Sequence, residues 1–361
     1  MTSPAGNILV TGGTGLVGHA IVEAFDGASV LSLTRHGAAG WHERTPEGNR
    51  SASGLLPDRH GHVVTAAGGV DNVVYIQGDV TQPRLGLTDA KYAELAGRVD
   101  AIVHSAGVSD FTTPKRAVEA LNVEGTRNII DLAQRADVPL YHISSAYVHA
   151  DGTSVKGRWG AAVYLESKRA AERLLEDSGV PAAIIRPSVV FGDSRTGYSP
   201  SFQGLHRLIG MMLKEQMPLL PFSPETRVDF LPRDVVGAVT ARLVRDGFRG
   251  EFWLSAGPDA LSFGRVVELL IEYGESLGLK LEPPRFVDRD MIERLIKPAG
   301  GETVARRIDV LLALTSHFES RPSLRSSLEP SERPDLEAAF MLGARYWGEK
   351  NGVASGVGVA A

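Results

Sequence analysis

The chain has 361 residues, of which 43% are hydrophobic and 22% charged, with 40 glycines, no cysteine and a net charge of −5 at pH 7. This composition is typical of a globular protein, and the length fits one large domain or two unequal ones. The absence of cysteine excludes disulfide bonds, cysteine-based zinc sites and thiolate nucleophiles. The charge does not favour nucleic acid as a partner, and no apolar run approaches the roughly 20 residues that span a bilayer. The first residues lack the pattern of a signal peptide, which predicts a cytoplasmic protein.

Short apolar segments alternate with amphipathic ones in the first part of the chain. We expect strands at 7–11, 29–34, 73–77, 101–105, 140–144 and 182–186. We expect helices at 16–25, 115–136 and 162–177. Continuous apolar strands separated by helices predict an α/β fold, a Rossmann-type doubly wound parallel sheet covered on both faces.

The second part of the chain is less regular and predicts a smaller, mostly helical C-terminal substrate-binding region. We expect helices at 201–216, from Asp234 onward, and at 262–277, 288–296, 303–317 and 335–346. We expect a loop at 218–224 and strands at 228–231 and 251–255. The predicted domains are a dinucleotide-binding domain at 1–192 with 228–256 contributing to it, a cap at 193–227 and 257–350, and a flexible tail at 351–361. Residues 36–71 form a long polar insertion.

A glycine-rich turn follows the first expected strand. The run at 11–18 reads TGGTGLVG and places Gly12, Gly15 and Gly18 at the spacing of a dinucleotide-binding loop. Gly12 permits the tight turn, Gly15 lets the backbone approach a pyrophosphate, and Gly18 lets the helix pack on the strand. The strand before it and the helix after it favour this interpretation over a plain turn, because the helix N-terminus then faces the anion.

The second expected strand indicates which dinucleotide binds. An NAD site usually ends this strand with an acidic residue that bonds the ribose 2′-hydroxyl. Here the strand ends at Thr34 and Arg35 follows, so we expect a 2′-phosphate and NADP(H), although a solvated surface arginine is the alternative. Arg44, Arg50 and Arg59 of the insertion are further candidates. Asp79, after the third strand, is placed either to contact the adenine region or to form a simple turn.

A tyrosine and a lysine at helical spacing predict acid–base chemistry. Tyr164 and Lys168 lie one turn apart, and a lysine ammonium near the phenol is expected to lower the tyrosine pKa from about 10. Ser145 at the end of the fifth strand could bond the reacting oxygen, and Ser144 is the competing assignment. Asn122 is a poor helix-interior residue, which indicates a role in a polar network or a surface position.

Together these motifs resemble the extended short-chain dehydrogenase/reductases. The motifs occur in that family's order over about residues 7–255. They are TGGTGLVG, HSAG at 104–107, NVEGT at 122–126, SSAYV at 144–148, YLESK at 164–168 and RPS at 186–188 with FG at 191–192. The runs GDVTQPRLGL at 78–87, GDSRTG at 192–197 and VDFLPRD at 228–234 resemble the thioester-reductase and fatty-acyl-CoA-reductase branch. The family's usual Ser-Thr is Ser-Ser at 144–145.

The resemblance implies an NADPH-dependent reductase of an acyl thioester, or of the free aldehyde or ketone. It implies Tyr164 and Lys168 as the catalytic pair, Ser145 as the hydroxyl that orients the substrate oxygen, and Asn122 beside them. It also implies that Lys168 binds the ribose and that no metal takes part. The implied cofactor-binding residues are Thr11, Gly12, Gly13, Thr14, Gly15, Leu16, Val17, Gly18, Arg35, Asp79, Val80, Ser105, Ala106, Gly107, Lys168, Pro187, Ser188 and Val189.

The substrate is less well defined by the sequence. Members of that branch often sit beside a carrier domain, and no carrier motif follows Tyr346, so we expect a carrier-bound acyl group delivered in trans or a small free substrate. The candidate lining residues are Phe111, His149, Phe202, Met211, Met212 and Phe222. The alternatives are a nucleotide-sugar epimerase or dehydratase, which Arg35 disfavours, and a non-catalytic NADP(H) sensor, which the Tyr164–Lys168 pair disfavours.

Overall fold

The computed structural model describes residues 6–25, 28–35, 64–65, 73–111, 113–149, 159–214, 218–287, 291–292, 294 and 323–353. Most of the insertion at 36–71, the expected helix at 303–317, most of the expected helix at 288–296 and the tail from 354 onward lie outside this part of the chain. Within the described residues, no helix is both long enough and apolar enough to cross a membrane.

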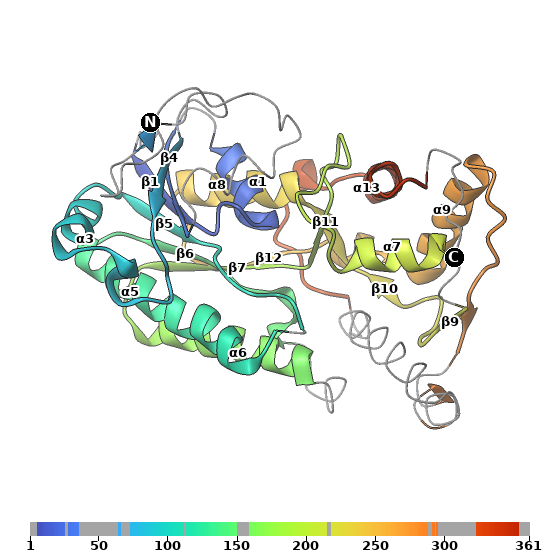
Figure 1. The fold of residues 1–361 in the computed structure, drawn as a ribbon, viewed down its shortest axis with the longest axis horizontal. Coiled ribbons are helices and arrows are strands. Elements are labelled where there is room, and N and C mark those ends of the chain that lie inside the picture. Colours follow the sequence, from blue (N-terminus) through green and yellow to red (C-terminus); the bar gives the residue numbers. More distant parts are fainter. Residues whose placement is uncertain are drawn as a thin grey trace.

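A parallel sheet forms the centre of the described structure (Figure 1). Seven of its described strands are parallel, and β3 (Val64–Thr65) adds one antiparallel pairing at the edge. In spatial order the parallel strands are β12 (Gly250–Leu254), β7 (Ala182–Pro187), β6 (Leu140–Ile143), β5 (Ala101–His104), β1 (Asn7–Thr11), β2 (Ser29–Thr34) and β4 (Val73–Gln77). The order reverses at β1, which pairs with β2 on one side and β5 on the other. The predicted Rossmann-type doubly wound sheet is therefore confirmed.

Helices cover both faces of this sheet, as its uninterrupted apolar strands predict. One face carries α1 (Leu16–Ala24) and α8 (Arg233–Arg245), and the other carries α3 (Asp89–Ala96), α5 (Gly125–Ala136) and α6 (Trp159–Asp177) (Figure 1). Successive side chains of β1 point to opposite faces, so Leu9 belongs to one hydrophobic core and Val10 to the other. At the α1–α8 contact, a Cβ on Gly237 would lie 2.4 Å from the carbonyl oxygen of Ala20, so glycine permits this close packing.

The helix expected at 115–136 contains a π-helical turn. It runs as α4 (Lys115–Glu119), a π-helical segment (Ala120–Glu124) and α5 without a break. Such turns are frequent at functional sites. Asn122 is the buried residue of this segment and is 1% exposed, so it is no surface residue.

Among the described residues, the second half of the chain adds three further helices and three short strand pairs. The helices α7 (Leu205–Leu213), α9 (Phe263–Ser276) and α13 (Leu336–Lys350) pack against one another (Figure 1). The strand pairs are β8 (Val189–Phe191) with β11 (Phe230–Pro232), β9 (Leu219–Leu220) with β14 (Arg285–Phe286), and β10 (Arg227–Val228) with β13 (Leu261–Ser262). Single 3₁₀ turns lie at Ala146–His149, Gly257–Asp259 and Pro330–Glu332, whereas the turn at Pro83–Gly86 contains two residues with positive φ, Arg84 and Leu85. The domain boundaries proposed from the sequence stay a prediction.

Three expectations for this half are wrong in detail. The helix expected at 201–216 begins only at Leu205, because Gly204 has a φ of 49° that helical backbone does not adopt. The loop expected at 218–224 contains β9. The strand expected at 228–231 is two strands, since the chain changes partner at Asp229 and the carboxylate of that residue accepts backbone N–H groups from Ala256 and Gly257 at 2.9 Å each.

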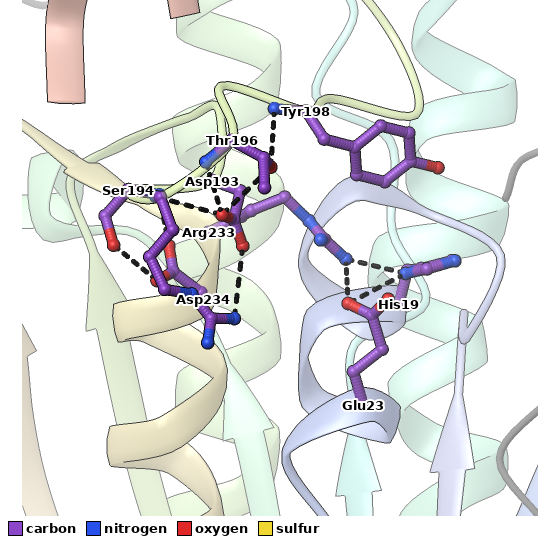
Figure 2. A network of polar contacts seen from close by, with 9 residues as sticks. His19, Glu23, Asp193, Ser194, Thr196, Tyr198, Arg233 and Asp234 are labelled. Atoms are coloured by element: carbon purple, nitrogen blue, oxygen red, sulfur yellow. Dashed lines mark hydrogen bonds and ion pairs between the residues drawn. The ribbon is translucent and has the colours of Figure 1, made fainter. Parts of the chain in front are cut away.

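The loop between β8 and α7 is folded around the carboxylate of Asp193 (Figure 2). This carboxylate accepts the backbone N–H groups of Arg195 and Thr196 and the Thr196 hydroxyl, each at 3.0 Å. The next residue, Ser194, donates its backbone N–H and its hydroxyl to Asp234 at 2.8 and 2.6 Å. The loop is thereby attached to the start of α8.

Arg233, the first residue of α8, joins this loop to α1. Its buried guanidinium Nη2 lies 2.6 Å from Nδ1 of His19 and 2.6 Å from Oε2 of Glu23, both on α1, with the Tyr198 ring beside it (Figure 2). Burial raises the pKa of Glu23, but the hydrogen bonds and charges of His19 and Arg233 outweigh burial and leave this pKa lowered. The helix that follows the glycine loop is therefore held by the second half of the chain.

Candidate active site

The glycine loop connects β1 to α1 through a tight turn. Gly12 has a φ of 71°, and a Cβ there would lie 2.7 Å from the backbone nitrogen of Ala106. A Cβ on Gly18 would lie 2.1 Å from the carbonyl oxygen of Gly12. The loop closes with a hydrogen bond of 2.9 Å from the Gly15 N–H to the Gly12 carbonyl. Side chains at these positions would therefore force the turn apart.

The N-terminus of α1 is suited to an anion. Gly15 precedes the helix and makes no side-chain capping hydrogen bond, and no acidic residue lies in the first turn. Thr14, Leu16 and Val17 are partly exposed around it, and Gly13 packs on Ser32 of β2. The first backbone N–H groups and the positive end of the helix dipole are thus available to a phosphate.

The segment after β5 lies against the glycine loop and the lysine. The Ala106 N–H donates to the hydroxyl of Thr11 at 3.1 Å. The next residue, Gly107, is exposed, and a Cβ there would lie 3.3 Å from Nζ of Lys168 and 3.2 Å from Oδ1 of Asn122. Ser105 is partly exposed beside them. Glycine keeps the space next to the lysine free of a side chain.

Tyr164 and Ser145 are brought together. A side-chain hydrogen bond joins them, and Tyr164 remains partly exposed. Burial raises the pKa of Tyr164 to about 12, and the bond to Ser145 opposes this rise. The expectation that Lys168 lowers this pKa is wrong for this structure, because desolvation of the phenolate dominates and the lysine is bonded elsewhere.

Lys168 is buried one turn further along α6. Its Nζ donates to the carbonyl oxygen of Ile143, the last residue of β6, at 2.9 Å. Burial lowers the pKa of Lys168 to about 8, and the negative charge of Glu172 opposes this effect. The ammonium is therefore the predominant form at pH 7 and loses its proton in mildly alkaline solution.

Asn122 connects the π-helical segment with α6. Its Nδ2 donates to the hydroxyl of Ser167 at 2.9 Å, and that hydroxyl donates to the Tyr164 carbonyl at 2.7 Å. Its Oδ1 accepts the Val108 N–H at 2.8 Å, and its Nδ2 also donates to the Val108 carbonyl at 3.2 Å. The side chain thereby fixes the segment after β5 against the helix that carries Tyr164 and Lys168.

Ser144 belongs to a buried ion-pair network, which separates its role from that of Ser145. Its hydroxyl donates to Glu172, and Glu172 accepts two hydrogen bonds from Arg186 at 3.0 and 2.8 Å. Arg186 is 1% exposed and also contacts Glu251 at 2.9 Å. Sequence reasoning did not single out Glu172, although its position four residues after Lys168 on the same helix face is a readable signal.

The other candidate cofactor residues lie at the ends of the strands. Arg35 is exposed directly after β2. The carboxylate of Asp79 accepts the backbone N–H and the hydroxyl of Thr81 at 2.9 and 2.8 Å, so it forms the turn. The Val80 carbonyl accepts from Asn128 at 2.7 Å. Pro187 ends β7, Val189 begins β8, and Ser188 connects the two strands. Arg44, Arg50 and Arg59 lie outside the described residues.

The candidate lining residues separate into two groups. Phe111 lies beside α6, with its ring centroid 5.8 Å from that of Tyr164. Met212 and Phe222 are buried in the hydrophobic core, and Phe202 and Met211 pack against it from partly exposed positions. The side chain of His149 is not among those that the structure describes. Across the described ranges, no cluster of three or more metal-ligating side chains occurs.

Comparisons with known proteins define the family. A family model described as male sterility protein matches residues 10–240, more than half of the chain. A hybrid PKS-NRPS synthetase of Penicillium citrinum is 24% identical over 321 residues, which cover 83% of this chain and 7% of that protein. A putative fatty acyl-CoA reductase of Drosophila melanogaster is 25% identical over 275 residues, which cover 64% of this chain and 52% of that protein. The chain thus spans about half of one relative and a small part of the other.

Solved structures share the fold. The terminal R domain from the myxalamid PKS-NRPS pathway superimposes with a TM-score of 0.68 at 21% identity, covering 98% of this chain and 93% of that one. A thiolation-reductase di-domain from an archaeal non-ribosomal peptide synthetase gives a TM-score of 0.68 at 16% identity, covering 98% and 77%. Fold, motif order and family model agree. The chain therefore belongs to the male sterility protein family, and its fold is the one that these solved structures share.

Proposed function

We propose that this chain uses NADPH to reduce the carbonyl of an acyl thioester and releases an aldehyde or an alcohol. The same site would reduce the corresponding free aldehyde or ketone. One observation carries the proposal: the hydrogen bond between Ser145 and Tyr164 lies beside the buried Lys168 at the carboxyl ends of the parallel strands. That edge of a doubly wound sheet is where such folds bind their ligands.

The glycine loop supports a pyrophosphate-containing cofactor. Gly12 and Gly18 leave no room for a Cβ, and the helix N-terminus behind them makes no side-chain cap. When bound, the dinucleotide supplies the hydride. The residues that we assign to it are Thr11, Gly12, Gly13, Thr14, Gly15, Leu16, Val17, Gly18, Arg35, Asp79, Val80, Ser105, Ala106, Gly107, Lys168, Pro187, Ser188 and Val189.

Arg35 supports NADPH rather than NADH. It is exposed at the end of β2, the strand next to the one that leads into the glycine loop. A guanidinium binds a phosphate through two parallel hydrogen bonds, whereas an acidic residue at this place would bond a free 2′-hydroxyl. The proposed preference therefore depends on a single side chain.

The catalytic set that we assign is Ser145, Tyr164, Lys168 and Asn122. A phenol with a pKa of about 12 is protonated at neutral pH, so Tyr164 can donate its proton to the substrate oxygen as negative charge develops there. The Ser145 hydroxyl donates a hydrogen bond to the same oxygen. The ammonium of Lys168, which the Ile143 carbonyl holds one turn further along the helix, is assigned to the cofactor ribose, and Asn122 holds the helix in place.

A thioester carbonyl is the substrate that the relatives favour. Reduction and protonation of that carbonyl give a hemithioacetal, whose loss of the thiol leaves an aldehyde, and a second reduction gives the alcohol. Because the sequence has no cysteine, no covalent thioester forms on a thiolate of this chain. One relative is named as a fatty acyl-CoA reductase, and one structural neighbour joins a thiolation domain to a reductase. Delivery by a carrier protein or coenzyme A is therefore part of the proposal.

Dinucleotide oxidation at 340 nm tests this function. The full chain is supplied with NADPH or NADH and with acyl-CoA, acyl-pantetheine or aldehyde substrates. We expect NADPH consumption, with a thiol and an aldehyde or alcohol as products. Conversion of a nucleotide sugar without net consumption would instead support an epimerase, and tight NADPH binding without consumption of any substrate would support a sensor.

A further inference from the structure

A buried histidine links the glycine loop to the helix that carries Asn122. His104 is the last residue of β5 and is 1% exposed. Its Nδ1 lies 2.8 Å from the hydroxyl of Thr11, and its Nε2 lies 3.2 Å from the hydroxyl of Thr126. Thr11 directly precedes the glycine loop, and Thr126 lies one turn after Asn122. One imidazole thus spans the two segments that the proposed function needs for the dinucleotide and for the catalytic helix.

The donors in this chain of hydrogen bonds can be assigned at every step. The Thr126 hydroxyl donates to the backbone carbonyl of Asn122 at 2.7 Å, so it accepts from His104, and Nε2 of His104 must carry a proton. At the other end, the Thr11 hydroxyl accepts the Ala106 N–H at 3.1 Å and has its own proton left for the bare Nδ1. Donors and acceptors thus follow one direction, from the Ala106 N–H through Thr11, His104 and Thr126 to the Asn122 carbonyl.

The far end of this series of hydrogen bonds reaches α6, the helix that carries Tyr164 and Lys168. The Asn122 side chain bonds the Ser167 hydroxyl, and Ser167 lies between Tyr164 and Lys168 on α6. The same side chain bonds both backbone groups of Val108. A displacement of the glycine loop therefore moves groups that determine where α6 lies.

We propose that His104 is a positioning residue whose neutral Nε2–H tautomer couples the geometry of the glycine loop to that of Asn122 and the catalytic helix. The inference rests on the proposed function for what binds at each end. A protonated imidazole would donate from both ring nitrogens, so the Thr11 hydroxyl would have to accept from Nδ1 instead of donating to it, and the single direction of these hydrogen bonds would be lost. Burial lowers the pKa of His104 to about 3, with the charge of Lys168 adding to the effect, so the ring stays neutral throughout the working pH range.

The neighbouring histidine provides a natural control. His142 pairs with His104 across β5 and β6, and the two ring centroids are 5.4 Å apart. It is also 1% exposed, but neither of its ring nitrogens has a hydrogen-bond partner among the described residues. Burial in this layer of the sheet therefore does not by itself produce the bonds that His104 makes.

Two amide substitutions separate the two ends of His104. An asparagine amide occupies the place of Nδ1 and keeps the Thr11 bond, whereas a glutamine amide reaches the place of Nε2 and keeps the Thr126 bond. We expect His104→Gln to weaken NADPH binding about tenfold while kcat at saturating NADPH changes less than about threefold, and His104→Asn to do the reverse. If His104→Gln and His104→Asn changed NADPH affinity to the same extent and kcat to the same extent, the proposal would be overturned.

A double-mutant cycle tests the coupling itself. Thr11→Val and Thr126→Val each remove one hydroxyl, and their effects on the NADPH dissociation constant and on the unfolding equilibrium constant are combined. We expect the change in each constant in the double variant to be at least about fivefold smaller than the product of the changes in the two single variants. This coupling should vanish in a His104→Leu background and persist in a His142→Leu background. Additive effects in the wild-type background would refute the coupling.

The tautomer has a direct spectroscopic signature. Nitrogen-15 spectra of the histidine-labelled chain should show one ring with a protonated Nε2 and a bare Nδ1 that disappears in His104→Gln. A protonated Nδ1 on that ring would overturn the inference. This measurement and the unfolding cycle need no bound dinucleotide. A wild-type chain that binds no NADPH but keeps the tautomer and the coupling would therefore contradict the proposed function alone.

Discussion

Replacing the buried lysine should stabilise the fold while it abolishes activity. Lys168 is 6% exposed, and its folded pKa of about 8 lies below the ordinary lysine value of 10.5 because burial disfavours the ammonium. That gap corresponds to about 3 kcal/mol of unfavourable free energy when the charged side chain is buried at pH 7. Lys168→Met removes the charge and also removes the hydrogen bond to Ile143, which contributes about 1 kcal/mol. The expected net gain in unfolding free energy at pH 7 is about 2 kcal/mol.

The sign of the pH dependence identifies the cause. Between about pH 8 and 10.5 the unfolded chain keeps the lysine proton and the folded chain has lost it, so the wild-type stability rises with pH through this window. The slope that this one group adds approaches about 1.4 kcal/mol per pH unit. Above pH 10.5 neither state carries the proton, and the variant should be the less stable protein by the value of its lost hydrogen bond.

Urea unfolding at half-unit steps from pH 6.5 to pH 11 measures this difference. Lys115 has an exposed side chain on α4, so Lys115→Met is a control that removes a solvated charge and should add no such slope. A Lys168→Met variant that is destabilised at pH 7, or whose difference from the wild type does not vary with pH, would refute the reasoning. Loss of turnover in the same variant would show that the charge is kept for function.

Three further substitutions test single contributions. Tyr164→Phe should keep NADPH affinity and lower turnover by about 10²–10⁴-fold in the 340 nm assay, and near wild-type turnover would contradict its role as proton donor. Arg35→Glu should raise the KM for NADPH at least about tenfold and leave that for NADH unchanged; equal effects on both would remove the argument for the 2′-phosphate. Glu172→Gln should cost about 3 kcal/mol of unfolding free energy, because Arg186 stays buried with less compensating charge. The same change should move the alkaline limit of the rate below pH 8, since the carboxylate raises the pKa of Lys168; an unchanged pH–rate profile would contradict this.

The fold could be predicted from the sequence because its signals are local. The apolar run of β5, Ala101–His104, is buried along its whole length, as a central parallel strand requires. The strand–glycine–helix succession at 11–18 marks the start of such a sheet without reference to any distant residue. The weaker expectations were those where partners lie far away in sequence, as at Asp229, whose carboxylate bonds Ala256 and Gly257 and so determines where β10 ends.

The sequence indicates the residues of the candidate site, which stay a prediction, but it does not indicate their electrostatics. The helical spacing of Tyr164 and Lys168 places them on one face, yet spacing says nothing about desolvation. Burial raises the phenol pKa to about 12, whereas the local pattern alone predicted a lowered value. Ser144 and Ser145 were equivalent as sequence, and only their different partners, Glu172 and Tyr164, distinguish them.

The end of β6 explains why two adjacent serines are used. The Ile143 carbonyl accepts a hydrogen bond from the Lys168 ammonium, the Ser144 hydroxyl donates to Glu172, and a side-chain hydrogen bond joins Ser145 to Tyr164. Three successive residues thus contact three positions of α6 that are each one turn apart. Because the three partners are spaced along α6, these contacts fix the position of this helix along its axis relative to the end of β6. Moving the helix by one residue would break all three contacts at once. The ion-pair network at Glu172 and the proton donor at Tyr164 therefore depend on the same position of α6. A substitution at either residue is expected to shift Lys168, which lies between them on this helix.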